Sequence, residues 1–253
     1  MTAKNCVLLL KSTSSDGEDK YKKLLHQNNF NVECVNTLTF QFKNISALSE
    51  KLKAPENYEG VLLSSPRCVS ALQQASYNNV LDKWKGKHNF AVGETTWKIA
   101  LEQLGLDCKG KDSGSAIKLT EVILKEKSQY KNLFLLPHGN LATDTLTLEL
   151  QKAGLVLDTI EIYDTLPNPN IEPELFNATD GFKCIPEYIV FFSPSGVSTT
   201  ISFIEMFKDN FGAIKFIAIG QTTKAALEQL NLTVYGVPKQ PNPQELLNVI
   251  LNK

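Results

Sequence analysis

The chain is poor in arginine, cysteine and histidine. Arg67 is the single arginine among its 26 basic Lys and Arg residues. Five cysteines are scattered along 253 residues without a CxxC pair, and the three histidines lie far apart in the sequence. Disulfide frameworks have clustered cysteines, and zinc sites have closely spaced Cys and His ligands. We therefore expect reduced thiols, as in the cytosol, and no metal site.

Other absences argue against membrane and nucleic-acid partners. No apolar run approaches the length that spans a bilayer, and the first residues lack the basic-then-apolar pattern of a signal peptide. The formal net charge is -1 without a dense basic block, so electrostatics give no support for binding nucleic acid or an anionic membrane. The content of 42% hydrophobic and 21% charged residues is typical of one large or two modest globular domains.

Short apolar runs alternate with segments of helical period along the chain. This alternation favours βαβ units and a parallel sheet. Strands are expected over 7–10, 32–35, 60–63, 90–92, 133–136, 160–163, 188–192 and 215–219. Helices are expected over 19–27, 69–75, 96–104, 143–153, 198–206 and 223–230. The pattern therefore predicts an α/β fold.

Three blocks of the sequence occur twice, in the same order. VLLSSPRCVSAL is similar to VFFSPSGVSTTI, FAVGETTWKIALEQLGL to FIAIGQTTKAALEQLNL, and SAIKLTEVIL to PQELLNVIL. Their period of more than a hundred residues indicates two copies of one α/β domain rather than a solenoid.

The repeat leaves two domain arrangements open. Tandem halves would divide the chain near 125–130, whereas an interleaved arrangement needs two crossing segments, near 36–43 and 160–169. The Pro/Asn-rich LPNPNIEP (166–173) resembles a linker that only the interleaved arrangement requires.

The first repeated block places hydroxyl groups directly after an apolar strand and before a helix. In an open parallel sheet this is the carboxyl end of the strand, where helix amino ends and unpaired backbone N–H groups bind ligands. Serine also caps helices, and for a single copy capping alone is the more frequent explanation. Because the block is duplicated, both explanations stay open for Ser64, Ser65, Ser193, Pro194, Ser195 and Gly196.

Two G-x-T-T turns, at 93–96 and 220–223, occupy the same strand-to-helix position. Their backbone N–H groups and hydroxyls could seat a carboxylate or a phosphate. Neither turn matches the glycine motifs of nucleotide-binding loops, and capping by a threonine is the alternative in each pair. The candidate side chains are Thr95, Thr96, Thr222 and Thr223.

Further positions could bind a ligand or take part in proton transfer. Arg67 has a planar fork suited to carboxylates, although a solvent-facing position without function is equally consistent with the sequence. Gly139 and Asn140 follow a strand, where the Asn amide can donate to a ligand. Tyr163 ends a strand, and its phenol could donate a proton or simply pack. No nucleophile motif occurs, so an enzyme of this sequence would work by positioning and hydrogen bonding.

At these residues the chain resembles the uroporphyrinogen-III synthase family. The similarity extends over nearly the whole chain, through VLLLK, YEGVLLSSPRCVSAL, AVGETT, LLPHGN, IEIYDT, VFFSPSGV, FIAIGQTTKAAL and PNPQELL. It implies two flavodoxin-like α/β domains with doubly wound parallel sheets, one inserted in the other and joined by a two-stranded linker. The implied limits are 1–36 plus 168–253 for the first domain, 44–160 for the inserted domain, and 37–43 and 161–167 for the linker strands.

The resemblance also implies a reaction. The family closes hydroxymethylbilane, a linear tetrapyrrole, to uroporphyrinogen III, with inversion of the last ring through a spiro intermediate and loss of water, and it uses no metal and no cofactor. Tyr163 is then expected to assist departure of the hydroxide. We expect a cytosolic monomer with a transient contact to the preceding pathway enzyme. The expected substrate-binding residues are Ser64, Ser65, Arg67, Thr95, Thr96, Gly139, Asn140, Ser193, Pro194, Ser195, Gly196, Thr222 and Thr223.

Three alternatives stay open at this point. They are a ligand-binding two-domain protein, a nucleotide-dependent α/β enzyme, and a family member that has lost its activity. The lack of a signal peptide argues against the first, and the lack of a phosphate-binding glycine loop argues against the second. The sequence does not decide the third.

Overall fold

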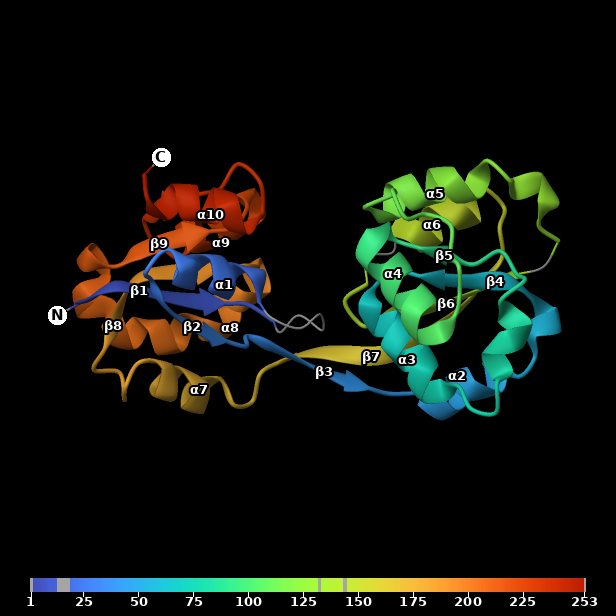
Figure 1. Cartoon of the computed structure of the whole chain (residues 1–253), viewed down its shortest axis with the longest axis horizontal. Coiled ribbons are helices and arrows are strands. Elements are labelled where there is room, and N and C mark those ends of the chain that lie inside the picture. Colours follow the sequence, from blue (N-terminus) through green and yellow to red (C-terminus); the bar gives the residue numbers. More distant parts are fainter. Residues whose placement is uncertain (1, 13–18, 132, 143–144, 253) are drawn as a thin grey trace. The chain divides into compact units, whose positions relative to one another are not determined.

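The computed structural model describes residues 2–12, 19–131, 133–142 and 145–252. The chain forms two compact units, one built from Met1–Thr39 with Leu166–Lys253 and the other from Phe40–Thr165. The second unit is thus inserted in the first, and each contains a five-stranded sheet (Figure 1). The predicted α/β class with an inserted second domain is confirmed. The two units are defined by contacts within the structure. The expected domain limits, 1–36 with 168–253 and 44–160, stay a prediction.

The first unit is a sheet with the strand order β10-β9-β8-β1-β2. Its pairings are parallel. The strands are β1 (Thr2–Leu10), β2 (Asn31–Val35), β8 (Ile185–Phe191), β9 (Lys215–Ala218) and β10 (Val234–Gly236). The helices are α1 (Lys20–Gln27), α7 (Ile171–Ala178), α8 (Pro194–Ile204), α9 (Gln221–Gln229) and α10 (Pro243–Ile250), with the 3-10 helix η4 (Glu205–Ala213).

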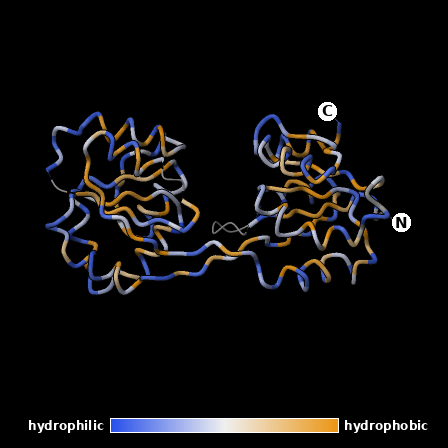
Figure 2. Tube along the Cα trace, turned by 180° about the vertical axis from the view of Figure 1, so that it is seen from behind, coloured by the Kyte–Doolittle hydropathy of each residue, from blue (hydrophilic) through white to orange (hydrophobic). Residues whose placement is uncertain are grey.

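Helices bury both faces of this sheet. Leu8 and Leu10 of β1 lie in a core shared with α7, α8 and α9, whereas Val7 and Leu9 lie in a second core shared with α1 and α10. A strand that is buried on both faces needs apolar residues at every position. This explains why the second half of β1, residues 6–10, is a continuous apolar run. Figure 2 shows hydrophobic trace inside the unit.

The second unit has the strand order β3-β7-β6-β4-β5. β4 pairs in parallel with β5 and β6, and β6 pairs in parallel with β7. The strands are β3 (Leu38–Phe42), β4 (Tyr58–Leu63), β5 (Phe90–Ala91), β6 (Leu133–Gly139) and β7 (Leu157–Pro167). The 3-10 helices are η1 (Pro55–Asn57), η2 (Val80–Trp84) and η3 (Lys127–Gln129). One core contains residues of α2 (Ile45–Leu52), α3 (Pro66–Ala75) and α4 (Gly93–Leu104), and the other contains residues of α5 (Ala116–Leu124) and α6 (Thr145–Lys152).

Four helices begin earlier than the sequence pattern predicts. α3 and α8 start at Pro66 and Pro194, since proline suits a first helical position, where its fixed φ is helical and its missing N–H is not needed. The Ser-Pro segments are therefore the first turns of helices rather than loops. α4 and α9 start at Gly93 and Gln221, so the threonines of the G-x-T-T turns lie inside these helices.

The linker prediction over 166–173 is wrong in its last part. β7 continues to Pro167, and α7 begins at Ile171 with Pro173 in its first turn. Proline is tolerated in the first turn of a helix because the N–H groups there have no partner within the helix. The expected elements also lack α2, α5, α7, α10 and β10. The helix expected over 143–153 begins at Thr145 in the structure, and 143–144 lie outside the described residues.

Candidate active site

Tyr163 lies against Gly139 in the second unit. The pairing of β6 with β7 places the two residues opposite each other. A Cβ atom at position 139 would lie 2.4 Å from both Cε2 and Cζ of the Tyr163 ring. Real Cβ atoms do not approach other atoms this closely, so glycine is what admits the ring here. Gly139 is buried, and its role in the structure is to make room for the phenol.

Asn140 extends the pairing of β6 with β7. Its N–H donates to the Tyr163 carbonyl (3.1 Å), and its Oδ1 accepts the N–H of Thr165 (2.8 Å). The amide oxygen is therefore engaged with the backbone beside Tyr163, and the amide nitrogen, which the sequence suggested as a ligand donor, lies 3.5 Å from the Thr165 carbonyl oxygen. These two bonds fix β7 at the Tyr163 carbonyl and at Thr165, directly after Tyr163.

Two aromatic residues of β3 meet the Tyr163 ring. Phe40 and Phe42 lie on the same side of the strand because they are two residues apart. Their ring centroids lie 6.2 and 6.3 Å from that of Tyr163, with interplanar angles of 78° and 74°. Edge-to-face pairs of this kind contribute about 0.5–1.5 kcal/mol each. Sequence reasoning missed both residues, although the alternation in LTFQF could have placed them on one face.

Arg67 lies over the face of Phe40. Its guanidinium carbon is 3.4 Å from the centre of the ring, a geometry that combines stacking with a cation–π interaction. In the described parts of the chain no carboxylate forms an ion pair with this guanidinium. Burial lowers the pKa of Arg67, against the opposing effects of Tyr163 and Cys68. The sequence left open a solvent-facing position without function for Arg67. In the structure Arg67 is instead half-buried and stacked on Phe40.

Ser64 and Ser65 precede α3 and contact a thiol one turn further on. Their hydroxyl oxygens lie 3.5 and 3.4 Å from the sulfur of Cys68, which donates to the Pro137 carbonyl (3.2 Å). Ser65 occupies the N-cap position without making a side-chain cap bond. Its hydroxyl instead contacts the Cys68 sulfur and acts on the Tyr163 phenol, whose pKa it lowers. Capping alone therefore does not account for Ser65.

The Tyr163 phenol is protonated at neutral pH. Burial raises its pKa above the ordinary tyrosine value, and the neighbouring Cys68 adds to this effect. The Ser65 hydroxyl and the positive charge of Arg67 act in the opposite direction, because both favour the phenolate. A protonated phenol beside a cation and a hydroxyl donor can give up a proton to a departing group, with its anion then stabilised in place.

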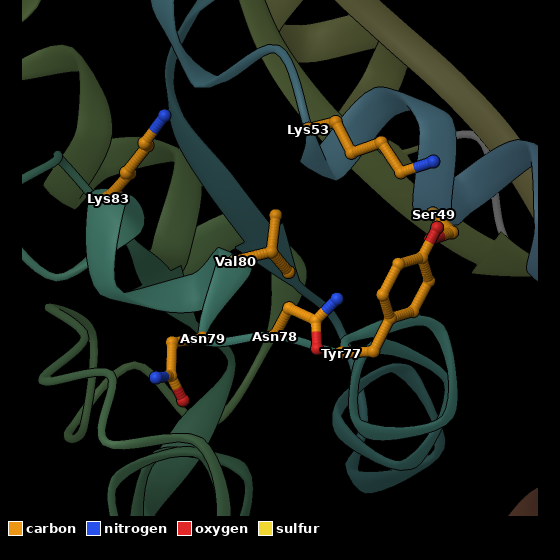
Figure 3. Close-up of a pocket in the computed structure, with 7 residues that line it drawn as sticks. All are labelled: Ser49, Lys53, Tyr77, Asn78, Asn79, Val80 and Lys83. Carbon is orange, nitrogen blue, oxygen red and sulfur yellow. The ribbon is translucent and has the colours of Figure 1, made fainter.

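A hollow elsewhere in the second unit has a different character (Figure 3). Its volume is about 300 Å³, and it is lined by Ser49, Lys53, Tyr77, Asn78, Asn79, Val80 and Lys83. Hydrogen bonds with Lys53 and Ser49 lower the pKa of the exposed Tyr77, which is the opposite of the shift at Tyr163. None of the residues that the sequence singled out lies in this lining. Tyr77 therefore serves as a reference for a tyrosine outside the candidate site.

The first turn of α8 is the counterpart of the α3 turn in the first unit. Ser193 is its N-cap residue, and the Ser193 Oγ accepts the Gly196 N–H (3.0 Å) and lies 3.1 Å from the Ser195 Oγ. Capping is thus the observed role of Ser193. Pro194 is exposed, and Ser193 and Ser195 are half-buried, so Ser195 is the partly accessible hydroxyl of the turn that does not cap the helix.

Gly196 is closely packed rather than open to a ligand. A Cβ atom there would lie 3.2 Å from the Ser193 Oγ and 3.4 Å from the Thr37 Oγ1. The Thr37 hydroxyl is buried and is the one such side-chain group without a hydrogen-bond partner among the residues that the structure describes. Thr37 carried no signal in the sequence, because nothing in the local pattern shows that it meets a helix of the same unit far along the chain.

The threonines of the two G-x-T-T turns do not cap their helices. The N-cap residues are Val92 and Gly220, so the capping role suggested for a threonine in each pair is wrong. The pairs match in burial: Thr95 and Thr222 are exposed. Thr96 and Thr223 are only 3% and 2% exposed.

The amino end of α4 is already partly occupied by the chain itself. The Gly93 N–H donates to the Ser113 Oγ (3.1 Å) and to the Gly110 carbonyl (3.3 Å). A ligand at this turn would therefore have to use the N–H groups of later residues. Fewer backbone N–H groups are therefore free to bind an anion at 93–96 than the sequence suggested.

Within the described ranges, no group of three or more His, Cys, Asp and Glu side chains could hold a metal ion. The five cysteines are all free thiols. Of the helices in the described ranges, none has both the length and the apolar character needed to cross a membrane.

Comparisons with known proteins converge on one family. The family model described as uroporphyrinogen-III synthase HemD matches residues 19–248. A uroporphyrinogen-III synthase of Saccharomyces cerevisiae is 23% identical over 206 residues, which cover 75% of this chain and 74% of the yeast protein.

Two solved structures have a similar fold. The uroporphyrinogen-III synthetase from Helicobacter pylori gives a TM-score of 0.66 at 14% identity, covering 97% of this chain and 98% of the other. A mutant uroporphyrinogen III synthase from Thermus thermophilus gives 0.60 at 14% identity, covering 98% and 99%. At this level of identity the two structures support the fold, and the family match rests on the sequence.

Proposed function

Because the chain belongs to the uroporphyrinogen-III synthase family, whose members are cyclising lyases of haem biosynthesis, we propose that it converts hydroxymethylbilane to uroporphyrinogen III. The reaction joins the two ends of a linear tetrapyrrole, inverts the last ring through a spiro intermediate and releases one water molecule. The observation that carries the proposal is the half-buried, protonated Tyr163 phenol beside Arg67 and Ser65.

Tyr163 is the proposed proton donor. The terminal hydroxyl of the substrate leaves more readily as water than as hydroxide, so a proton delivered to it lowers the barrier. The Tyr163 phenol gives that proton, and the Arg67 charge with the Ser65 hydroxyl stabilises the phenolate that forms. The proton returns when the pyrrole that closes the macrocycle loses its ring proton. The step therefore balances without a metal or a cofactor.

Binding of the substrate carboxylates is the proposed role of the helix first turns. Arg67 has no carboxylate partner in the described chain and can bind one carboxylate with its fork. Ser195, Thr95 and Thr222 present accessible hydroxyls next to helix amino ends. The full proposed substrate-binding set is Ser64, Ser65, Arg67, Thr95, Thr96, Gly139, Asn140, Ser193, Pro194, Ser195, Gly196, Thr222 and Thr223.

The members of this set contribute in different ways in our proposal. Gly139 and Asn140 act by holding Tyr163 in place. Ser193 and Gly196 shape the α8 turn. Thr96 and Thr223 stay in the set because each lies beside an accessible threonine of the same turn. Substitution of one threonine at a time distinguishes the contributions of the two neighbouring side chains to substrate binding.

Freshly prepared hydroxymethylbilane tests the proposed function. The products are oxidised and the isomers I and III are separated, because spontaneous closure gives isomer I. Formation of isomer III faster than in a heat-denatured control supports the proposal. Formation of isomer I alone, at the uncatalysed rate, would show that this chain is a family member without the proposed activity.

We further propose that the enzyme is a cytosolic monomer that meets the preceding pathway enzyme transiently. The five free thiols are consistent with a reducing compartment. Light scattering of the purified chain tests the monomer, and cell fractionation tests the compartment.

A further inference from the structure

Phe40 touches both residues of the proposed proton-donating pair, and it comes from a strand to which neither belongs. Its ring face holds the Arg67 guanidinium of α3 at 3.4 Å. Its ring also forms an edge-to-face pair with the Tyr163 ring of β7 at a centroid distance of 6.2 Å. Phe40 therefore connects α3 to β7 at the point where the proton is transferred.

Phe42 offers a natural comparison. It lies on the same side of β3 and meets the Tyr163 ring with nearly the same geometry, 6.3 Å and 74°. In the described part of the molecule, the cation–π contact of Arg67 is with Phe40 and not with Phe42. The two residues therefore share the packing role against Tyr163 and differ in their contact with the cation.

Arg67 depends on this stack for its position. An arginine side chain has many rotamers, and fixing it costs conformational entropy unless a partner compensates. No ion pair with a carboxylate restrains this guanidinium in the described chain. The flat face of Phe40 is thus the contact that holds the positive charge near the phenol, where the charge can act on it.

We propose that Phe40 is a positioning residue that holds the Arg67 guanidinium beside the Tyr163 phenol. This inference rests on the proposed function of Tyr163 and Arg67. Phe40 acts through Arg67 and does not itself contact the substrate. Removal of its ring therefore weakens both the stabilisation of the phenolate and the binding of a substrate carboxylate.

The charged and titratable groups around Tyr163 are few in the described chain. Arg67 and Cys68 face it from α3. On β6, His138 is next to Gly139 and its Nδ1 is 3.0 Å from the Gly139 carbonyl oxygen. Beyond β3, Lys43 is bonded to Asp164 (2.7 Å) and forms an ion pair with Glu161, both of β7. Among these groups, Arg67 is the one that Phe40 contacts, so a change at Phe40 acts on the phenol through that charge.

A double-mutant cycle tests the dependence on Arg67. Phe40→Leu is expected to lower kcat/KM by about 3- to 20-fold, as expected for loss of one partly buried cation–π contact. Phe40→Tyr, which keeps the aromatic face, restores the wild-type value. In the Arg67→Gln background, Phe40→Leu costs clearly less than in the wild type and no more than the packing control Phe42→Leu, because the cation that it positions is gone. Equal losses from Phe40→Leu in both backgrounds would overturn the proposal, since packing alone predicts additivity.

The pKa of the phenol gives an independent readout that needs no activity. Carbon-13 labelling at tyrosine Cζ, with Tyr163→Phe for assignment, follows its ionisation. Phe40→Leu raises the pKa of Tyr163 if the Arg67 charge moves away. A loss of packing alone admits water to the phenol and lowers the pKa of Tyr163, because the phenolate is then better solvated. This lower pKa is the result expected of the matched control Phe42→Leu. A fall or no change in Phe40→Leu contradicts the proposal.

The two measurements separate failure of this inference from failure of the proposed function. If Tyr163→Phe and Arg67→Gln retain full turnover, the proposed function of these side chains fails, while the phenol titration still reports whether Phe40 holds Arg67. If both are impaired but Phe40→Leu is additive and lowers the pKa, the function stands and Phe40 is only a packing residue.

Discussion

The Tyr163 ring crosses the backbone of Gly139 so closely that a single added methyl group has no room. Two ring atoms lie 2.4 Å from the place of a Cβ atom at position 139, and the phenol oxygen lies 2.8 Å from it. The proposed proton donor is therefore held on one side by a glycine and on the other by Phe40 and Phe42. The position of the phenol depends on all three contacts.

Gly139→Ala should displace the Tyr163 ring and lower turnover by about 10- to 100-fold, because a shift of about an ångström at a reacting group has costs of this size. Overpacking should also reduce the free energy of unfolding by about 1–3 kcal/mol. Steady-state kinetics and urea denaturation measure the two effects. Gly86→Ala is the matched control, since a Cβ atom there meets nothing within 4 Å. Wild-type turnover in Gly139→Ala would show that the position of the ring does not matter.

Tyr163→Phe should lower turnover by about 100- to 10,000-fold, the range expected when a general acid is removed. The ring and its aromatic contacts stay, so the melting temperature should change little. Turnover of hydroxymethylbilane and differential scanning calorimetry test this. Tyr77→Phe, at an exposed tyrosine of the same unit, should retain full activity. An active Tyr163→Phe enzyme would remove the phenol from the chemistry.

The two threonines of the α9 turn can be separated by substitution. Thr223→Ala should raise the apparent KM or slow closure, since the proposal gives this side chain a part in holding the substrate. Thr223 does not cap α9, whose N-cap residue is Gly220, so a kinetic defect could not be assigned to a lost cap. Thr222→Ala, at the exposed neighbour, is the paired variant. Kinetics equal to wild type in both variants would leave this turn without a role in binding.

The pH dependence of kcat should report the pKa of Tyr163. The phenol is active as a donor only while protonated, so kcat falls as the pH rises through its pKa. Burial raises that pKa, so the alkaline limb should lie above the ordinary tyrosine value of about 10. Arg67→Gln should move the limb further up, because Arg67 favours the phenolate. A limb below the ordinary value, or one unmoved by Arg67→Gln, would argue against Tyr163 as the donor.

The sequence was sufficient for the architecture because the signals for it are local or repeated. The apolar run of β1 reflects burial on both faces, and the duplicated blocks revealed two copies of one design. The sequence predicts four helix starts too late because the Ser-Pro and G-x-T-T segments are interpreted as loops and turns that precede the helices. Pro66 and Pro194 are in fact the first helical residues.

The sequence indicates which residues are candidates for the site, but it does not show which of them contact one another. Tyr163 and Gly139 were singled out separately, and only the β6–β7 register shows that one makes room for the other. Phe40 was missed because a phenylalanine in a strand is ordinary, and its contact with Arg67 depends on packing between β3 and α3. The sequence suggests the Asn140 amide as a free ligand donor, whereas in the structure its oxygen accepts the Thr165 N–H.

The central claim is that this chain closes hydroxymethylbilane with inversion of the last ring. The most direct measurement is the ratio of isomer III to isomer I formed from fresh hydroxymethylbilane by the wild-type chain and by Tyr163→Phe. The account predicts isomer III as the main product of the wild type and mostly isomer I from the variant. Isomer I alone from the wild type, at the spontaneous rate, would contradict it.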